Sequence, residues 1–501
     1  MPRLPWTGLP HLPWRNRDDA TGGQPPAEGL VLSGGGSRAS FQLGALRYLY
    51  DRADIAPSTF VGTSAGSIIT VMLAQHADRD DQAAALRALE SLWLGMRSSD
   101  EMFTPRPWFV RLQERGSEWL GLLQTEAAKP APKRSLPKLG FFRTPEEEAV
   151  DAPDERAVEP EELTGQARTL QLAMADPITP SRGFDPGLAM GLMSMLPRLR
   201  SAGDDLSLIL RGADASRSMY HPGTLLTRLL DAEFFTSQAV AQSGVTVRIS
   251  MVALESGQLR FMTENGDMVD RENQPLPDIP RQDLSMGSLA SCSIPTVFAP
   301  VPIGEEWYVD GGTRESTPAE MAIGHLGVER CYVVVSNAVE DPPSESFAHK
   351  SMLSIMFRAT QILTEEAERD EVAYARNAGA LVIEPELFIH DALTVDPGLL
   401  RINRDYGWLR AAEAHLQLPT TTRAIHRRVI GNRVRALELE RRVLEGPAPE
   451  ALLRELTRLK LQVRDDLAQL DSTQLPEDAA SWWSDWERHV EDVARRPVWL
   501  P

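Results

Sequence analysis

The stretch FVGTSAGSII, residues 60–69, places Ser64 between Gly62 and Gly66, after a short apolar run and ahead of another. This Gly-x-Ser-x-Gly spacing is typical of a serine held on a sharp turn between a buried strand and a helix. Such a turn strains the backbone at the serine, and a Cβ at the flanking positions would collide with the strand or the helix. The pattern therefore predicts a hydroxyl that projects from the carboxyl end of a strand.

The surrounding residues predict a parallel sheet. LVLSGGG (30–36) has the pattern of a buried strand that ends in glycines, and residues 37–52 carry apolar side chains at helical spacing. Strand 58–62 and helix 64–77 follow, and this alternation is typical of βαβ topology. Residues 55–77 contain no Asp, Glu, Lys or Arg and are long enough to span a bilayer. Their glycines, serines and threonines favour a buried strand, turn and helix instead.

The composition limits the class of protein. The chain has 501 residues and a formal net charge of −19, which argues against broad nucleic-acid binding because that needs a basic face. It contains two cysteines, Cys292 and Cys331, so we expect neither zinc nor a disulfide framework, and we predict a cytoplasmic protein. Residues 1–28 lack the apolar core of a secretory signal and are predicted to be a flexible leader.

The middle of the chain interrupts the α/β pattern. Residues 96–215 contain no convincing strand, and their segment 144–162 holds nine acidic residues against one basic, which predicts a solvated segment. The α/β pattern then resumes near residue 220. The predicted elements are a helix at 223–234, paired strands at 245–257 and 258–265, a helix at 283–293, strands at 305–312 and 329–337, a helix at 350–378, a strand at 379–386 and a helix at 398–416.

Three consecutive glycines end the first predicted strand. Gly34, Gly35 and Gly36 let backbone amides approach an oxyanion closely, and they begin a helix whose dipole favours negative charge. One such donor lowers the barrier of an acyl transfer by about 3–4 kcal/mol. Arg38, in the first turn of that helix, is a candidate to order the loop or to meet a phosphate; the alternative is a surface arginine.

The same glycines also match a relaxed dinucleotide-binding pattern, Gly34-x-Gly36-x-x-Ala39. That site needs an acidic residue at the end of the second strand, where it holds the ribose. The second strand ends in Gly62-x-Ser64 instead. We therefore favour an oxyanion loop.

A nucleophilic serine needs a base that removes its proton. The chain has nine histidines, and none stands in a glycine-flanked loop after a late strand, where a Ser-His-Asp triad would need it. Asp310 does follow a late strand, and Gly311 and Gly312 allow a turn that presents its carboxylate. The alternative for a lone Asp-Gly-Gly is a β-turn with a local hydrogen bond. We favour the base, because two strand ends already carry the serine and the glycine loop.

Five segments resemble the patatin-like phospholipase family: GGGxR (34–38), GxSxG (62–66), ASCSIPTVFAPV (290–301), DGG (310–312) and RESTP (314–318). The resemblance covers about 29–95 and 216–410. Ala39 stands where the family commonly has glycine, and we expect helix packing to tolerate this small side chain.

The resemblance implies a three-layer α/β/α fold and a Ser–Asp dyad that works without a histidine, a metal or another cofactor. It makes Ser64 the nucleophile and Asp310 the base. The amides of Gly34, Gly35 and Gly36 would form the oxyanion hole together with that of Ala65. The implied reaction is hydrolysis of phospholipid or lysophospholipid esters through an acyl-enzyme.

The resemblance and the residues together give the expected domains. Residues 29–338 form the catalytic domain with a helical, acidic insertion at 96–215, and 339–420 complete it. From 421 to 501 we expect a charged helical extension. The extension either forms a homodimer or is a solvated face.

The insertion has two apolar flanks that either touch a membrane peripherally or roof the pocket: Trp108, Phe109, Leu112, Trp119 and Leu120, and Met190, Leu192, Met193, Met195 and Leu196. An amphipathic helix with aromatic residues can lie among lipid head groups. Two other functions stay open. One is a Ser-His-Asp α/β-hydrolase acting on soluble esters, and the other is a catalytically silent scaffold with the patatin fold.

Overall fold

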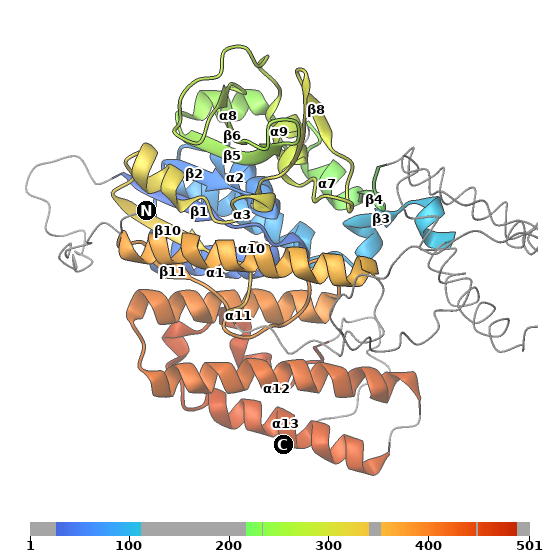
Figure 1. The fold of residues 1–501 in the computed structure, drawn as a ribbon. Helices are drawn as coiled ribbons and strands as arrows, with labels where there is room; N and C mark the ends of the chain where they lie inside the picture. The colour runs from blue at the N-terminus through green and yellow to red at the C-terminus, as the bar shows by residue number, and fades with distance from the viewer. Residues whose placement is uncertain (1–26, 112–216, 233, 340–351, 447–448, 488–501) are drawn as a thin grey trace, which may run out of the picture. The chain divides into compact units, whose positions relative to one another are not determined.

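The computed structural model describes residues 27–111, 217–232, 234–339, 352–446 and 449–487. The chain divides into two units. One contains Met1–Pro105 and Arg217–Pro501, and the other contains Arg106–Ser216. The account below concerns the first unit (Figure 1). The predicted leader, the acidic segment 144–162 and all insertion residues named above except Trp108 and Phe109 lie outside the described residues, apart from the last two residues of the leader.

The first unit is built on a mixed nine-stranded sheet. Its main strand order is β11-β10-β1-β2-β5-β6-β7, and β9 joins it beside β5 and carries β8. Strands β11, β10, β1, β2 and β5 are parallel, whereas β6, β7 and β9 run against their neighbours. The strands are β1 (Glu28–Leu32), β2 (Thr59–Gly62), β5 (Thr246–Ala253), β6 (Leu259–Thr263), β7 (Met268–Val269), β8 (Val301–Ile303), β9 (Glu306–Asp310), β10 (Arg330–Val334) and β11 (Leu381–Ile383).

Helices cover both faces of the sheet, which gives the expected three-layer α/β/α fold. Successive side chains of a strand point to opposite faces. Leu30 and Leu32 accordingly join the core that contains side chains of α1, α2, α3, α9 and α11, whereas Val31 joins a second core with Val372 of α10. The helices are α1 (Ser40–Arg52), α2 (Ala65–Ala74), α3 (Arg79–Leu94), α7 (Thr224–Leu229), α8 (Ser237–Ser243), α9 (Leu284–Ser291), α10 (Met352–Asn377), α11 (Pro397–Leu416), α12 (Thr420–Glu445) and α13 (Glu450–Leu467).

Strand β5 aligns two other strands end to end. Strand β2 runs parallel to β5 and stops where Gly62 pairs with Ile249. Strand β9 runs antiparallel to β5 and stops where Asp310 pairs with Met251. Since Ile249 and Met251 are two residues apart, these strand ends face each other over about 7 Å of extended chain. Asp310 therefore lies close to the end of β2, because β9 runs toward β2 in the opposite direction along the same edge of β5.

A short two-stranded sheet of the first unit joins the two chain segments that flank residues 106–216 in the sequence. Strand β3 (Phe103–Pro105) pairs antiparallel with β4 (Tyr220–Pro222). The expectation that residues 96–215 contain no strand is therefore wrong at β3. Three residues are too few for an alternating apolar pattern, and the partner strand lies more than a hundred residues further along the chain.

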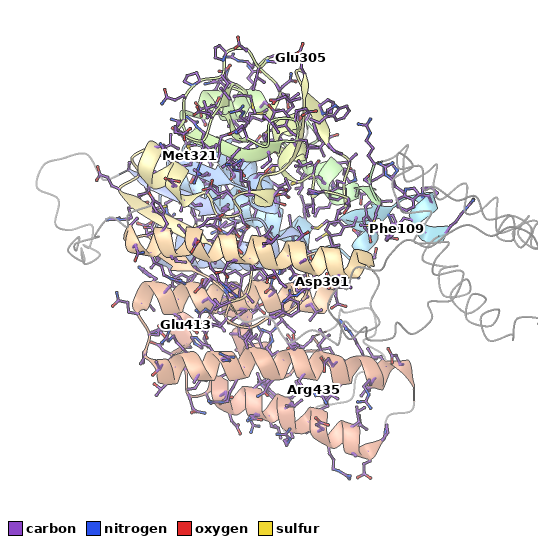
Figure 2. The ribbon with its side chains drawn as sticks, viewed as in Figure 1. Phe109, Glu305, Met321, Asp391, Glu413 and Arg435 are labelled. Atoms are coloured by element: carbon purple, nitrogen blue, oxygen red, sulfur yellow. The ribbon has the colours of Figure 1, made fainter. Side chains whose placement is uncertain are left out.

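The last helices pack on the sheet domain through α1. Figure 1 shows α11, α12 and α13 stacked in that order, and Figure 2 labels Glu413 on α11 and Arg435 on α12. Within this stack the guanidinium of Arg433 is buried between Asp405 (2.8 Å) and Glu487 (2.7 Å). Several leucines of the predicted charged extension are buried within the chain, among them Leu437, Leu439, Leu452, Leu456 and Leu459. Among the described residues no helix is long and apolar enough to cross a bilayer.

Two glycines let α1 and α11 touch backbone to backbone. A Cβ at Gly44 would lie 1.7 Å from the Arg404 carbonyl oxygen, and a Cβ at Gly407 would lie 1.9 Å from the Phe41 carbonyl oxygen. Both distances are far shorter than van der Waals contact, so any side chain at either position forces the helices apart. This contact docks the C-terminal helices onto the part of the chain that carries the glycine loop.

We expect Gly407→Ala to lower the free energy of unfolding by about 1–3 kcal/mol, because the added methyl overpacks this contact. Gly431→Ala on α12 is the matched control, since a Cβ there meets nothing within 4 Å. Alanine at that position should stabilise the helix by up to about 1 kcal/mol. Denaturant unfolding of the two variants measures both effects. Equal stability of Gly407→Ala and wild type would contradict the close contact.

Candidate active site

Ser64 sits on a strained turn between β2 and α2. Its backbone has φ 52° and ψ −128°, a left-handed conformation that costs free energy in a residue with a side chain. A Cβ at Gly62 would lie 2.5 Å from Thr70 Oγ1, and one at Gly66 would lie 2.5 Å from the Leu32 carbonyl oxygen. The two glycines thus allow α2 to start directly against β1 and β2, with the serine between strand and helix.

Asp310 ends β9 and is buried beside Ser64. Its carboxylate accepts a hydrogen bond from the Gly312 amide (2.7 Å), and the nearby Ser64 side chain lowers its pKa. Burial raises the pKa of Asp310 to about 6, although these two neighbours work in the opposite direction. The structure therefore places Ser64, the predicted nucleophile, near the carboxylate of Asp310, the predicted base.

The glycine loop lies next to the serine. A Cβ at Gly34 would lie 3.3 Å from the Ser64 Cβ. The Gly34 amide, however, donates to the Ser316 carbonyl (3.2 Å), so this amide is not available to an oxyanion in this conformation. In the described part of the chain, no acceptor is found for the amides of Gly35, Gly36 and Ala65. The expected set of four oxyanion donors is thereby reduced to these three.

Arg38 contacts the glycine loop itself. Its Nε lies 3.5 Å from the Gly35 carbonyl oxygen, and its own carbonyl accepts a hydrogen bond from Asn403 (3.1 Å). Its positive charge acts on both Glu368 and His390, which shows that the guanidinium lies near these side chains. Arg38 therefore lies against the glycine loop, and its role in ordering the loop or in meeting a phosphate stays a prediction.

Ser291 is a site residue that we did not single out from the sequence. Its hydroxyl accepts the hydrogen bond of the Ser64 amide (2.9 Å), and the Ser67 hydroxyl donates to the Ser64 carbonyl (2.6 Å). Both peptide groups of the strained serine are therefore held by side chains. The signal was present in the sequence, because Ser291 belongs to the ASCSIPTVFAPV segment, but the segment alone does not reveal that its hydroxyl reaches the turn.

An apolar pocket opens beside the serine. The aromatic rings of Phe103 and Phe298 stack at 5.7 Å along one part of its wall. None of its lining residues is charged, and no histidine of the described residues lines it. His11, His349 and His489 lie outside the described residues. The lining is Ser64, Ala65, Ile68, Trp93, Met102, Phe103, Leu225, Leu226, Leu229, Cys292, Ile294 and Phe298.

The pocket's composition suits a hydrocarbon chain better than a charged or hydrogen-bonding group. Its wall comes from segments far apart in the chain, on α2, α3, β3, α7 and the residues around α9. Among the described residues, no cluster of three or more His, Cys, Asp or Glu side chains could hold a metal ion.

Comparison with known proteins identifies the family. The family model of the patatin-like phospholipases matches residues 30–323, more than half of the 501 residues. The chain therefore belongs to the patatin-like phospholipase family. It is, at the level of that family, a lipid acyl hydrolase.

Other comparisons add less. No curated protein matches the sequence. VipD from Legionella pneumophila is a similar solved structure, with a TM-score of 0.25, 12% identity and coverage of 92% of this chain and 91% of that one. The type III effector ExoU has a TM-score of 0.19 and 15% identity, with coverage of 92% of this chain and 72% of ExoU. The ExoU–SpcU complex of Pseudomonas aeruginosa has a TM-score of 0.20 and 12% identity, with coverage of 92% of this chain and 68% of the matched chain. The family membership stands on the family model alone.

We expect Ser291→Ala to disturb the turn at Ser64, because it leaves a buried amide without an acceptor at a cost of about 1–3 kcal/mol. The variant should unfold at a lower temperature and react more slowly with a fluorophosphonate. Ser288→Ala, one turn earlier on α9, is the control, since the Ser288 hydroxyl is buried without a partner among the described residues. If both variants behave alike in thermal unfolding and labelling, Ser291 does not support the turn.

Proposed function

We propose that this chain hydrolyses ester bonds of phospholipids or lysophospholipids, with Ser64 as the nucleophile and Asp310 as the general base. The observation that carries the proposal is the strand register at β5, which brings the end of β2 before Ser64 and the end of β9 at the buried Asp310 together. The influence of the Ser64 side chain on the pKa of Asp310 agrees with this proximity. The apolar pocket beside Ser64 supports it further, because an acyl chain needs such a wall.

The proposed reaction has two steps. Asp310 takes the Ser64 proton as the serine oxygen attacks the ester carbonyl, and the oxyanion accepts hydrogen bonds from the amides of Gly35, Gly36 and Ala65. The intermediate collapses, and the leaving alcohol takes the proton from Asp310. Water then gives a proton to Asp310 as it attacks the acyl-enzyme. The fatty acid leaves, and Ser64 regains its proton.

A buried carboxylate is well suited to this role. A general base works best when its pKa lies near the working pH. An exposed aspartate, with a pKa near 3.9, is a weak base at neutral pH. Because burial raises the pKa of Asp310 to about 6, its ionised form is a stronger base and is still the main form at pH 7.

We expect Ser64→Ala to abolish fluorophosphonate labelling and fatty-acid release, and Asp310→Asn to lower the rate by about 10²–10⁴-fold, the usual contribution of a positioned base. Substrates are phosphatidylcholine vesicles and lysophosphatidylcholine micelles, and thermal unfolding verifies that each variant is folded. An indispensable histidine, found by replacing the nine in turn, would favour a triad. A folded wild type that neither labels nor hydrolyses lipid would favour the silent scaffold.

We expect kcat/KM to fall tenfold per pH unit below about pH 6. The base must be ionised to accept the serine proton, and burial has moved its pKa up to about 6, so activity is present above that pH and lost below it. Fluorophosphonate labelling between about pH 4.5 and pH 8 gives the same profile without lipid aggregation. A labelling rate that is constant down to pH 5 would exclude Asp310 as the base.

Contact of the insertion with a membrane and dimerisation through residues 421–501 stay predictions. Liposome co-sedimentation and sedimentation velocity, respectively, address them.

A further inference from the structure

We propose that Glu368, on helix α10, is a positioning residue of the active site, whose buried carboxylate ties together the segments that follow β1, β9 and β10. This inference rests on the proposed function. Glu368 lies beyond residues 30–323, which the family model matches, and no motif of the sequence points to it.

Three side-chain donors converge on this carboxylate. Its Oε1 accepts hydrogen bonds from the hydroxyls of Ser316 (2.9 Å) and Thr317 (3.2 Å), and its Oε2 accepts one from the Asn337 amide. The side chain is 5% exposed. Burial raises the pKa of Glu368, whereas these three donors and the positive charge of Arg38 oppose that change.

One line of contacts runs from Glu368 to the glycine loop through Ser316. The Ser316 hydroxyl is bound by Glu368, and the carbonyl of the same residue accepts the Gly34 amide (3.2 Å). Ser316 also belongs to the segment that leaves the Asp310 turn. Through the one residue Ser316, the carboxylate therefore holds both the glycine loop and the segment that follows the proposed base.

A second line runs through the end of β10. Asn337 binds Glu368, and the adjacent Ser336 amide donates to the Ser33 hydroxyl (2.9 Å), directly before Gly34. A Cβ at Gly35 would lie 2.4 Å from the Ser336 Cβ, so the loop rests closely on this segment. The first line ends on Gly34 and the second on Ser33, the two residues that precede Gly35 and Gly36, whose amides we assign to the oxyanion.

The next turn of α10 holds the segment after Asp310 by a further hydrogen bond. Glu371, one turn after Glu368, accepts a hydrogen bond from the Thr317 amide (2.6 Å). Burial raises the pKa of Glu371 to about 8, with the charges of Glu315 and Glu368 adding to the effect. Burying carboxylates is unfavourable unless hydrogen bonds compensate. Here the donors that compensate come from segments around the active site.

The geometry separates an effect on the reaction from an effect on lipid binding. None of the residues that line the apolar pocket is hydrogen-bonded to Glu368 in the described structure. Loss of the carboxylate should therefore misalign the oxyanion donors and leave the acyl wall intact. A displacement of such donors by a fraction of an ångström to 1 Å is enough to slow a reaction by 10-fold to 100-fold.

The main test replaces Glu368 by methionine, which keeps the volume and removes every hydrogen bond. We expect Glu368→Met to lower kcat at least about 10-fold with KM changed less than about twofold. Glu368→Gln should stay within about threefold of wild type, because an amide can still pair with Asn337 and the hydroxyls. Glu366→Met is the matched control: Glu366 is exposed on the same helix and pairs only with Arg369 in the described structure (2.7 Å), so its kcat should equal that of wild type.

Two further measurements keep the test decisive. If Glu368→Met does not fold, the double variant Ser316→Ala with Thr317→Val removes the donors instead and should lower kcat in the same sense. Hydrogen–deuterium exchange provides a readout that needs no activity: peptides covering 33–38 and 310–318 should exchange faster in Glu368→Met than in Glu366→Met.

The outcomes distinguish the two proposals. An inactive wild type whose Glu368→Met variant shows faster exchange at 33–38 would overturn the proposed function and keep Glu368 as a positioning residue. An active wild type whose Glu368→Met variant keeps its kcat and its exchange pattern would overturn the role of Glu368. A fall in thermal stability with kcat unchanged would also overturn it, since it would show a structural role only.

Discussion

The proposed active site of this chain depends on one strand that pairs with two others running in opposite directions. Strand β5 is parallel to β2 at Ile249 and antiparallel to β9 at Met251. Hydrogen-bond register leaves little freedom along a sheet, so the ends of β2 and β9 are held about two residues apart. Ser64 and Asp310 follow or occupy those ends. Register, and not a flexible loop, thus sets the distance between hydroxyl and carboxylate.

Burial gives this arrangement its chemical character. The carboxylate of Asp310 lies in surroundings that raise its pKa to about 6, and Ser64, the proposed nucleophile, is held at φ 52°, a strained backbone angle. Neither feature stabilises the fold. Each is sustained by neighbours: the Ser291 hydroxyl holds the Ser64 amide, and the Gly312 amide holds the Asp310 carboxylate. The glycine contact between α1 and α11 supports the helix that follows the glycine loop.

Much of the fold could be predicted because the apolar pattern within each strand already indicates that the strand is buried. Apolar runs ending in glycine mark β1 and β2, and the alternation of Leu30, Val31 and Leu32 reflects a sheet covered on both faces. Strand β3 could not be predicted, because its partner β4 follows more than a hundred residues later in the chain. The hydrogen bond of the Gly34 amide could not be predicted either. Its acceptor is the Ser316 carbonyl, which is distant in the chain.

The sequence by itself determined much of the local geometry: the Gly-x-Ser-x-Gly spacing predicted a tight strand-to-helix turn, and three glycines after a strand predicted a loop that allows a close approach of backbone. These are properties of φ, ψ and Cβ volume, which neighbouring residues decide. The tertiary structure alone decided which distant groups meet. The antiparallel entry of β9, the hydroxyl of Ser291 at the turn and the carboxylate of Glu368 behind the glycine loop all follow from long-range pairing and packing. No local pattern encodes such contacts, because the residues next to one partner in the sequence carry no information about the distant partner that it meets.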